Sequence, residues 1–324
     1  MIDCLSNPAW ISPQTDFLLF LQNIRVGNLE AFDKFFLSIT VIGEFWLPTL
    51  ICAITYWCID SRAGMYLLSL ESFNVLLAHL FKMLACVYRP WVLDNRIHPS
   101  ELAVSYAKGY SFPSGHTAMS SSVLGGIAYL LKHNKKIVML LIGLICLVGF
   151  SRLWLGVHTP QDIVGGLIIS IVLIFRVKPI IDWAERDKNR YLFLMCIIDL
   201  FAVLALIYIR YFNSYRIDYI DGELLVDPYK SIYVTIVVYG FILGLINGCY
   251  ACRKFVPFDP KEVSIKRRII RGVVGTVVTI ALLKLVMVPI FMNIINLKIA
   301  IPLTFLSGIT LTLVYPFIFK RLKG

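Results

Sequence analysis

The chain has 324 residues, of which 58% are hydrophobic and only 16% are charged, and its mean hydropathy is +0.77. A soluble domain carries about 25% charged residues, so this composition excludes a soluble globular domain with one anchor and indicates a polytopic membrane protein. The net charge of +11 does not indicate a nucleic-acid-binding protein, because the Lys and Arg residues occupy short loops between apolar segments.

The amino-terminal segment precedes the long apolar segments of the chain. It has no basic start followed by an apolar stretch and a small-residue cleavage site, so we expect no cleavable signal peptide. Residues 12–30 mix polar and apolar side chains, and we expect them to lie at the membrane interface. A span there is disfavoured by its polar residues, which are Gln22, Asn23, Arg25 and Asn28.

Nine apolar segments follow, and each is predicted to form a transmembrane helix. The predicted fold is therefore all-α, a polytopic membrane helical bundle of about nine transmembrane helices. The predicted spans are 36–58, 65–88, 117–132, 137–155, 162–177, 192–211, 231–250, 270–292 and 299–319.

The basic residues are divided unevenly between the two sets of alternate loops. One set carries 19 of the 31 Lys and Arg residues and the other carries 11, while Lys284 falls within a span. Cytoplasmic loops are enriched in Lys and Arg, so we expect the first set, which includes 132–136, to be cytoplasmic. The amino terminus is then outside and the carboxyl terminus inside. No Asn-x-Ser/Thr glycosylation site occurs, which favours a bacterial cytoplasmic membrane.

Three polar clusters interrupt this apolar chain, and all three are predicted to lie on the outward side. The first contains Lys82 and Arg89, which is followed by Pro90. Seven residues are nearly two helical turns, so we expect both cations on one helix face, with Pro90 ending the helix. The alternative is a pair of cations that only reach towards the interface.

The second cluster is Pro113-Ser114-Gly115-His116, at the start of the predicted span 117–132. Ser114 is a good helix cap, and Gly115 allows the backbone to approach a ligand closely. The first free N–H groups of this helix favour an anion. The alternative is an ordinary helix start with an unrelated histidine.

The third cluster contains Arg152 (after Ser151), His158 and Asp162. Thr159-Pro160 is typical of a helix entry, which places His158 just before a helix. Asp162 is either a capping acid or, four residues after His158, the acceptor of a hydrogen bond from the imidazole. Such a bond determines which ring nitrogen is free to attack a substrate.

Together the clusters supply three cations, two histidines and one carboxylate, a set typical of phosphoryl transfer. The cations neutralise the non-bridging phosphate oxygens, and arginine suits their planar arrangement. One neutral histidine attacks phosphorus while the other protonates the leaving oxygen.

At these residues the chain resembles the type 2 phosphatidic acid phosphatase superfamily, whose signature is K-x6-R-P, then P-S-G-H, then S-R-x5-H-x3-D. Every signature position is matched in order and spacing. The resemblance implies a metal-independent phosphatase, so we expect no metal and no cofactor. It implies that His158 is the nucleophile that forms a phosphohistidine, that Asp162 orients it, and that His116 is the general acid. The phosphate-binding residues that it implies are Lys82, Arg89, Ser114, Gly115 and Arg152.

The signature covers only residues 82–162, and six helices are the family's usual minimum. We therefore expect an extracytoplasmic or interfacial segment at 1–35, a six-helix phosphatase core at 36–211 and a three-helix extension at 212–324. This long layout is similar to the glucose-6-phosphatase and sphingosine-1-phosphate phosphatase branches of the superfamily.

The expected substrate is a lipid phosphate or polyprenyl pyrophosphate, because the three cations lie at predicted span ends, at the depth of a lipid phosphate. Three alternatives remain: a sugar-phosphate phosphatase, a lipid or sugar phosphotransferase, and a transporter with a relict phosphatase motif. The expected partners are this substrate and membrane lipids, with no nucleic acid and no obligatory protein partner.

Glu44 and Glu71 fall well inside predicted spans, where charged groups are usually paired or functional. Glu44 either borders a path for lipid or makes a hydrogen bond between helices. Glu71 is expected to face the protein interior.

Overall fold

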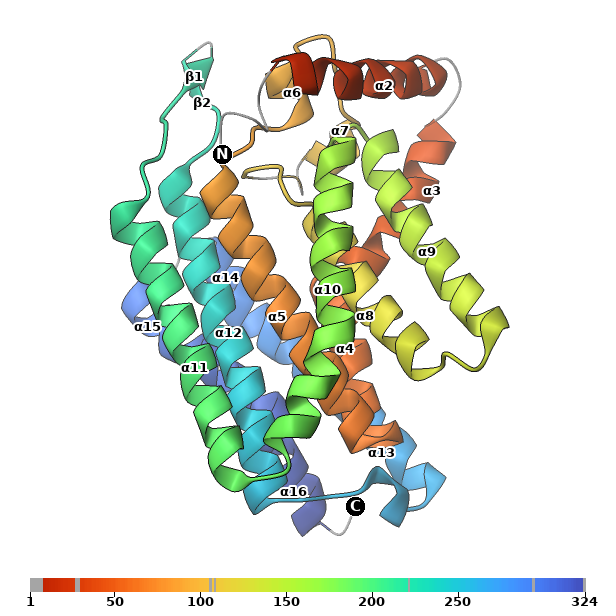
Figure 1. Cartoon of the computed structure of the whole chain (residues 1–324), viewed down its shortest axis with the longest axis vertical. Coiled ribbons are helices and arrows are strands. Elements are labelled where there is room, and N and C mark those ends of the chain that lie inside the picture. Colours follow the sequence, from red (N-terminus) through yellow and green to blue (C-terminus); the bar gives the residue numbers. More distant parts are fainter. Residues whose placement is uncertain are drawn as a thin grey trace. The chain divides into compact units, whose positions relative to one another are not determined.

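Figure 1 shows the computed structural model, which describes residues 8–26, 30–104, 107, 109–220, 222–292 and 295–322. The described chain is made of α-helices and short helical turns, together with one antiparallel hairpin of two-residue strands, β1 (Tyr219–Ile220) and β2 (Glu223–Leu224). The all-α prediction is confirmed.

The chain divides into two compact units, each made of several segments. The first unit comprises residues 1–45, 77–172 and 207–232, and the second comprises 46–76, 173–206 and 233–324. The helix α5 (Ser61–Ala85) and the helix α10 (Pro160–Ala184) contribute residues to both units. The other elements of the first unit are α2 (Pro8–Val26), α3 (Glu30–Thr40), the 3-10 turn η1 (Val41–Gly43), α6 (Pro90–Leu93), α7 (Glu101–Val104), α8 (Gly115–Leu130), α9 (Lys135–Trp154), the π-helical turn η3 (Tyr208–Phe212) and the hairpin.

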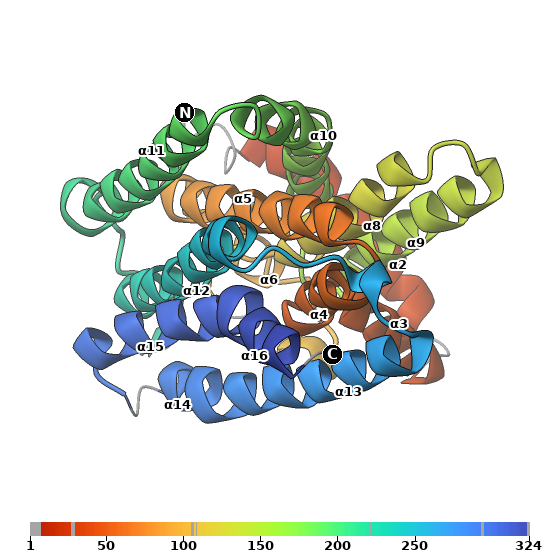
Figure 2. The same ribbon diagram turned by 90° about the horizontal axis from the view of Figure 1, so that it is seen from below.

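The second unit contains the carboxyl-terminal helices. Its elements are α4 (Trp46–Ile54), the π-helical turn η2 (Thr55–Ile59), most of α11 (Lys188–Ile207) and of α12 (Pro228–Phe255), the 3-10 turn η4 (Pro260–Glu262), α13 (Ile265–Leu282), the π-helical turn η5 (Leu283–Met287), α14 (Val288–Phe291), α15 (Leu297–Ile309), the π-helical turn η6 (Thr310–Val314) and α16 (Tyr315–Arg321). Within this unit α12 lies between α5 and α15 (Figure 2), and the Tyr239 hydroxyl of α12 donates to the Leu76 carbonyl of α5 at 2.6 Å.

Helices occur in all nine predicted ranges, but fewer of them are long enough to cross a bilayer. Within the described residues seven helical segments qualify, and an eighth does if Phe32–Gly43 and Trp46–Ile59 form one span. The helix α8 has 16 residues, about 24 Å at 1.5 Å per residue, which is short of the ~30 Å hydrocarbon core. The first predicted span is interrupted where Glu44 takes an extended backbone conformation (φ −75°, ψ 141°).

The helix α2 runs across the ends of α9 and α10 in the first unit (Figure 1). Its Trp10 indole donates to the Gln161 side chain at 2.5 Å, and its Arg25 guanidinium donates to the Trp154 carbonyl at 3.1 Å. Within the described part of the chain, α2 is not one of the helices that are both long and apolar enough to cross a bilayer. Its interfacial position in a membrane stays a prediction.

A small apolar core supports the segment that leads into His158. It joins residues of α3 and α7 with the end of α9 and the turn after it, and its buried members are Phe36, Ala103, Ala107, Trp154, Leu155 and Val157. Because Leu155 and Val157 are fully buried, the turn between α9 and α10 is held against the rest of the first unit.

Candidate active site

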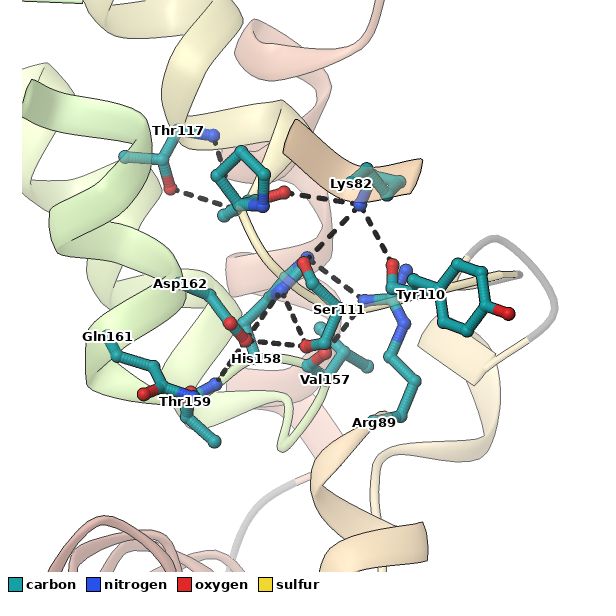
Figure 3. Close-up of polar contacts among 12 residues, drawn as sticks. Lys82, Arg89, Tyr110, Ser111, Thr117, Val157, His158, Thr159, Gln161 and Asp162 are labelled. Atoms are coloured by element: carbon teal, nitrogen blue, oxygen red, sulfur yellow. Dashed lines mark hydrogen bonds and ion pairs between the residues drawn. The ribbon is translucent and has the colours of Figure 1, made fainter. Parts of the chain in front are cut away.

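The three polar clusters of the sequence converge around His158, which lies in the turn between α9 and α10 (Figure 3). The His158 side chain is almost completely buried, with 2% of its surface exposed. All the residues of the site belong to the first unit. The hydrogen bonds at the two imidazole nitrogens of His158 determine which nitrogen is able to act as a nucleophile.

Asp162, in the first turn of α10, accepts three hydrogen bonds at one oxygen. Its Oδ2 lies 2.5 Å from the Ser111 hydroxyl, 2.8 Å from the Thr159 backbone nitrogen and 3.2 Å from His158 Nδ1. The two interpretations of Asp162 that the sequence left open are therefore both realised. The same oxygen caps the start of α10 and contacts the imidazole.

The contact on the other side of the ring determines the tautomer of His158. Arg89 Nη1 lies 3.0 Å from His158 Nε2. A guanidinium only donates hydrogen bonds, so Nε2 must be the accepting, unprotonated nitrogen. The proton of the neutral ring then resides on Nδ1, where it is donated towards Asp162.

The first cluster does not form a shared helix face, contrary to our expectation. The helix α5 ends at Ala85, Arg89 is extended (φ −69°, ψ 155°), and Pro90 begins α6 instead of ending a helix. Arg89 also donates to the carbonyls of Gly109, at 3.1 Å, and Val157, at 2.8 Å. Arg89 thus joins the loop before α8 to the turn that carries His158.

Lys82 organises the loop that precedes α8. Its ammonium donates to the carbonyls of Tyr110, Ser111 and Pro113, at 2.8, 3.3 and 3.2 Å. An ammonium has three donors, and in this arrangement each has a carbonyl acceptor. The Lys82 charge is therefore held beside the loop that bears the second cluster.

The second cluster begins α8 as predicted, with Ser114 as the helix cap. The Ser114 hydroxyl accepts from the Thr117 backbone nitrogen at 3.4 Å and from the Thr117 hydroxyl at 3.0 Å, and its backbone nitrogen donates to the Asp162 carbonyl at 2.9 Å. A Cβ added to Gly115 would meet no atom within 4 Å. The first turn of α8 is consequently open beside Gly115, where its free N–H groups favour an anion.

Arg152 and His116 lie together at a cavity of about 150 Å³. Arg152, in the last turn of α9, donates from Nη1 to the Thr40 hydroxyl at 2.8 Å. Its buried Nε has no hydrogen-bond partner among the described residues. The cavity is lined by Leu37, Thr40, Val41, Glu44, Ala103, His116 and Arg152.

Burial and nearby positive charge act on His158 in the same direction. Burial, followed by the charges of Arg89, Arg152 and Lys82, holds the pKa of His158 well below its ordinary value. Protonation would add a cation to a buried cationic site. The ring is therefore neutral at physiological pH, as its contact with Arg89 also requires.

Ser111 is the residue of this site that the sequence analysis missed. Its hydroxyl is fully buried, donates to Asp162 Oδ2 at 2.5 Å and lies 3.3 Å from His158 Nδ1. Ser111 precedes the Pro113–His116 motif by two residues, but it has no helical spacing to His158 or Asp162. Nothing in the sequence around Ser111 therefore distinguished this serine from an ordinary turn residue.

No group of three or more His, Cys, Asp or Glu side chains in the described part of the chain is arranged to hold a metal ion. His158 and Asp162 are instead surrounded by hydroxyl, guanidinium and backbone groups.

Comparison with known proteins identifies the family. Residues 63–186 match the PAP2 superfamily, and residues 236–324 match the transmembrane extension of PAP2 superfamily phosphatases. Phosphatidylglycerophosphatase B of Bacillus subtilis (strain 168) is 30% identical over 195 residues, covering 54% of this chain and 95% of that protein. The undecaprenyl-diphosphatase BcrC of the same organism is 35% identical over 105 residues, covering 30% of this chain and 51% of that protein.

A mammalian relative and one solved structure are also similar. Sphingosine-1-phosphate phosphatase 1 of Mus musculus is 26% identical over 190 residues, covering 56% of this chain and 43% of that protein. The crystal structure of a PAP2-type phosphatidylglycerolphosphate phosphatase from Bacillus subtilis has a TM-score of 0.42 and 26% identity, covering 55% of this chain and 90% of that chain. Because two family regions match and one bacterial relative is matched over nearly its whole length, the chain belongs to the PAP2 superfamily of membrane phosphatases.

Proposed function

We propose that this protein hydrolyses a lipid phosphate or polyprenyl pyrophosphate through a phosphohistidine on His158, at an active site on the extracytoplasmic face. The observation that carries the chemistry is the state of the imidazole. Nε2 is unprotonated and faces the Arg89 guanidinium, while Nδ1 faces Asp162. This is the arrangement that a nitrogen nucleophile beside a phosphate-binding cation requires.

In the first half-reaction the substrate phosphate displaces one hydrogen bond. A non-bridging oxygen takes the place of His158 Nε2 as an acceptor of Arg89 Nη1, which releases the Nε2 lone pair towards phosphorus. Lys82, Arg152 and the first turn of α8 at Ser114 and Gly115 add positive charge around the remaining oxygens. The N–P bond forms and the bond from phosphorus to the leaving oxygen breaks. His116, which is protonated once the negative charge of the bound phosphate offsets the surrounding cations, donates its proton to that oxygen.

In the second half-reaction water attacks the phosphohistidine. His116, now deprotonated, takes a proton from the water, and the N–P bond breaks to release phosphate and the neutral imidazole. Throughout, Asp162 accepts from Nδ1–H and stabilises the positive charge that develops on the ring. Ser111 is a positioning residue, because its hydroxyl donates to Asp162 Oδ2 and fixes that carboxylate against the ring.

The substrate class is supported by the relatives and by the setting of the site. The similar proteins are named for phosphatidylglycerophosphate, undecaprenyl diphosphate and sphingosine 1-phosphate, all of which are phosphorylated lipids. A lipid also keeps its apolar chain in the membrane, where each buried methylene contributes about 0.8 kcal/mol. A sugar phosphate lacks this contribution.

The proposed sidedness of the site is supported by one helical hairpin. The basic turn with Lys132, Lys135 and Lys136 lies where α8 ends and α9 begins, whereas His116 and Arg152 lie at the opposite ends of the two helices. If the basic turn is cytoplasmic, the site faces the other side of the membrane. A cysteine at position 133 should then react only with reagents that reach the cytoplasm, and one at position 219 only from outside; reversed labelling would contradict the orientation.

The test of the chemistry uses purified protein and its His158→Ala variant. Wild type should release inorganic phosphate from a panel of phosphatidylglycerophosphate, a polyprenyl pyrophosphate, sphingosine 1-phosphate and glucose 6-phosphate, and should do so in the presence of a chelator. The variant should fold but lose activity by about 10⁴-fold or more. Acid-labile phosphate should be trapped on wild type alone. Normal turnover by folded His158→Ala protein would overturn the phosphohistidine, and a tenfold preference for glucose 6-phosphate would overturn the lipid substrate.

A further inference from the structure

The cavity at His116 contains a carboxylate that the proposed chemistry does not use. Glu44 lines it together with Thr40, His116 and Arg152, and apolar side chains form the rest of its wall. Glu44 interacts electrostatically with the Arg152 guanidinium. An acidic side chain beside a phosphate site opposes phosphate binding unless it faces another part of the substrate.

Local backbone structure determines where Glu44 lies. The 3-10 turn η1 ends at Gly43, and Glu44 leaves the helical conformation. A Cβ on Gly43 would lie only 2.5 Å from the His116 carbonyl oxygen, so η1 packs directly on the first turn of α8. Glu44 is therefore held one residue beyond a close backbone contact with His116.

This position is on the leaving-group side of the reaction. In the proposed chemistry the phosphorus lies between His158 and the leaving oxygen, and the leaving oxygen receives its proton from His116. Atoms bonded to the leaving oxygen consequently extend into the cavity that His116 and Glu44 share. At about 150 Å³ the cavity has room for the first atoms of a leaving group.

We propose that this cavity receives the first atoms of the leaving group, and that Glu44 selects lipid phosphomonoesters with a hydroxyl or ammonium group next to the ester carbon over polyprenyl pyrophosphates. This inference rests on the proposed phosphatase function and narrows its substrate class. The Thr40 hydroxyl accepts a hydrogen bond from Arg152 and lines the same cavity as Glu44. Thr40 therefore lies beside both the phosphate-binding cation and the carboxylate that is proposed to select the substrate.

The chemistry of the two substrate classes differs where Glu44 lies. The leaving group of a phosphomonoester is an alcohol, and a neighbouring hydroxyl or ammonium donates a charge-assisted hydrogen bond to the carboxylate. The leaving group of a pyrophosphate is itself a phosphate, whose oxygens carry negative charge and accept hydrogen bonds. Those oxygens and the Glu44 carboxylate repel each other.

The test compares Glu44→Gln with wild type on three matched substrates, a 2-hydroxyalkyl phosphate, the alkyl phosphate of the same chain length and a polyprenyl pyrophosphate. Wild type should have the highest kcat/KM for the hydroxyalkyl phosphate. In Glu44→Gln the ratio of kcat/KM for hydroxyalkyl phosphate over pyrophosphate should fall by at least about tenfold. The control is Glu101→Gln, which removes an exposed carboxylate from α7, is not a cavity-lining residue and should leave the ratio unchanged.

Three outcomes would overturn the inference. The first is an unchanged ratio in folded Glu44→Gln protein, and the second is a wild-type preference for the pyrophosphate; both leave the phosphatase function intact. The third is the absence of phosphate release from every substrate by wild type, which removes the proposed function as well. If Glu44→Gln does not fold, Glu44→Ala should show the same fall in the ratio.

Discussion

Two regions of this molecule depend on glycine for a close approach between backbones, and they use it for different purposes. In the first unit, a Cβ on Gly43 would lie 2.5 Å from the His116 carbonyl oxygen. In the second unit, a Cβ on Gly244 of α12 would lie 2.1 Å from the Phe305 carbonyl oxygen of α15. The first contact places a residue of the proposed active site, whereas the second joins two helices.

The side chains around the two contacts explain the difference. Near Gly43 the buried groups are polar and charged, among them Arg152, Thr40 and, farther along the site, Asp162. Around Gly244 the buried neighbours on α12 are apolar or aromatic, such as Phe241, Ile242 and Leu245, each at most 1% exposed. Small residues that let helices approach closely are a common means of association in membranes. Changes in the first region should therefore affect turnover, and changes in the second should affect stability.

After the loss of His158 itself, the largest effect expected in the first region is that of Asp162→Asn. The amide cannot accept three hydrogen bonds at one oxygen as the carboxylate does, and it cannot stabilise a charged imidazole. We expect kcat to fall on the order of 10³–10⁴-fold while the melting temperature changes little. Steady-state kinetics and thermal unfolding of the same preparation measure both quantities. A loss of folded protein that accounts for the loss of turnover would contradict the comparison.

Ser111→Ala should have a smaller effect in the same direction. It removes the hydrogen bond to Asp162 Oδ2 and leaves the carboxylate less well oriented. We expect kcat to fall about 10–100-fold with little change in KM. Ser111→Thr, which restores the hydroxyl, should recover part of the activity. If Ser111→Ala raises KM alone, the hydroxyl contacts substrate and does not position Asp162.

Gly244→Ala tests the second region. The added methyl group would overlap the Phe305 backbone, which cannot rotate away as a flexible side chain would. We expect the free energy of unfolding to fall by about 1–3 kcal/mol, while the activity per folded molecule stays close to that of wild type. Gly143→Ala is the matched control, because a Cβ there would meet no atom within 4 Å. Equal stability of the two variants would show that the α12–α15 contact is not tight.

Gly43→Ala makes the same substitution in the first region. The first turn of α8 must shift to relieve the overlap with His116, which displaces the proposed general acid. We expect kcat to fall about tenfold with a smaller change in stability than that of Gly244→Ala. A substrate with an acidic leaving group needs no proton and should be affected less. An equal loss on both kinds of substrate would argue against displacement of His116.

The smallest effect expected is a pH dependence of stability due to His158. Its pKa is lowered in the folded protein by burial and by nearby cations, so below about pH 6.5 the unfolded chain binds the extra proton. Stability should then decrease as the pH falls below this value, by at most about 1.4 kcal/mol per pH unit. His158→Gln should reduce this dependence, and His133→Gln, on an exposed histidine, should not. The same slope in both variants would exclude His158 as its source.

Sequence patterns were sufficient for the parts of this protein that depend on near neighbours along the chain. Apolar segments of about 20 residues predicted the helices, because every helix that crosses a bilayer needs about this length of apolar sequence. The caps at Ser114 and Asp162 and the contact between His158 and Asp162 all join residues three or four positions apart. The spacing of the signature residues predicted the family, and the comparisons with known proteins confirm that prediction.

Local patterns failed where a helix ended early or was too short. The spacing of Lys82 and Arg89 predicted a shared face, but α5 ends at Ala85 and the two cations reach the same loop from different elements. Hydropathy also does not register the break at Glu44 or the 16-residue length of α8. By length and composition, seven or eight of the described helices can therefore cross a bilayer, against about nine predicted spans.

The sequence by itself determined that this protein is a helical membrane protein of the PAP2 superfamily, and it determined which residues carry the signature of that family. Only the tertiary structure decided that Arg89 donates a hydrogen bond to His158 Nε2, that Ser111 donates one to Asp162 and that Glu44 lines the same cavity as His116. These contacts join residues about 50 to 70 positions apart in the chain. No helical or strand period relates such positions, and they meet because the buried surfaces of separate helices pack together.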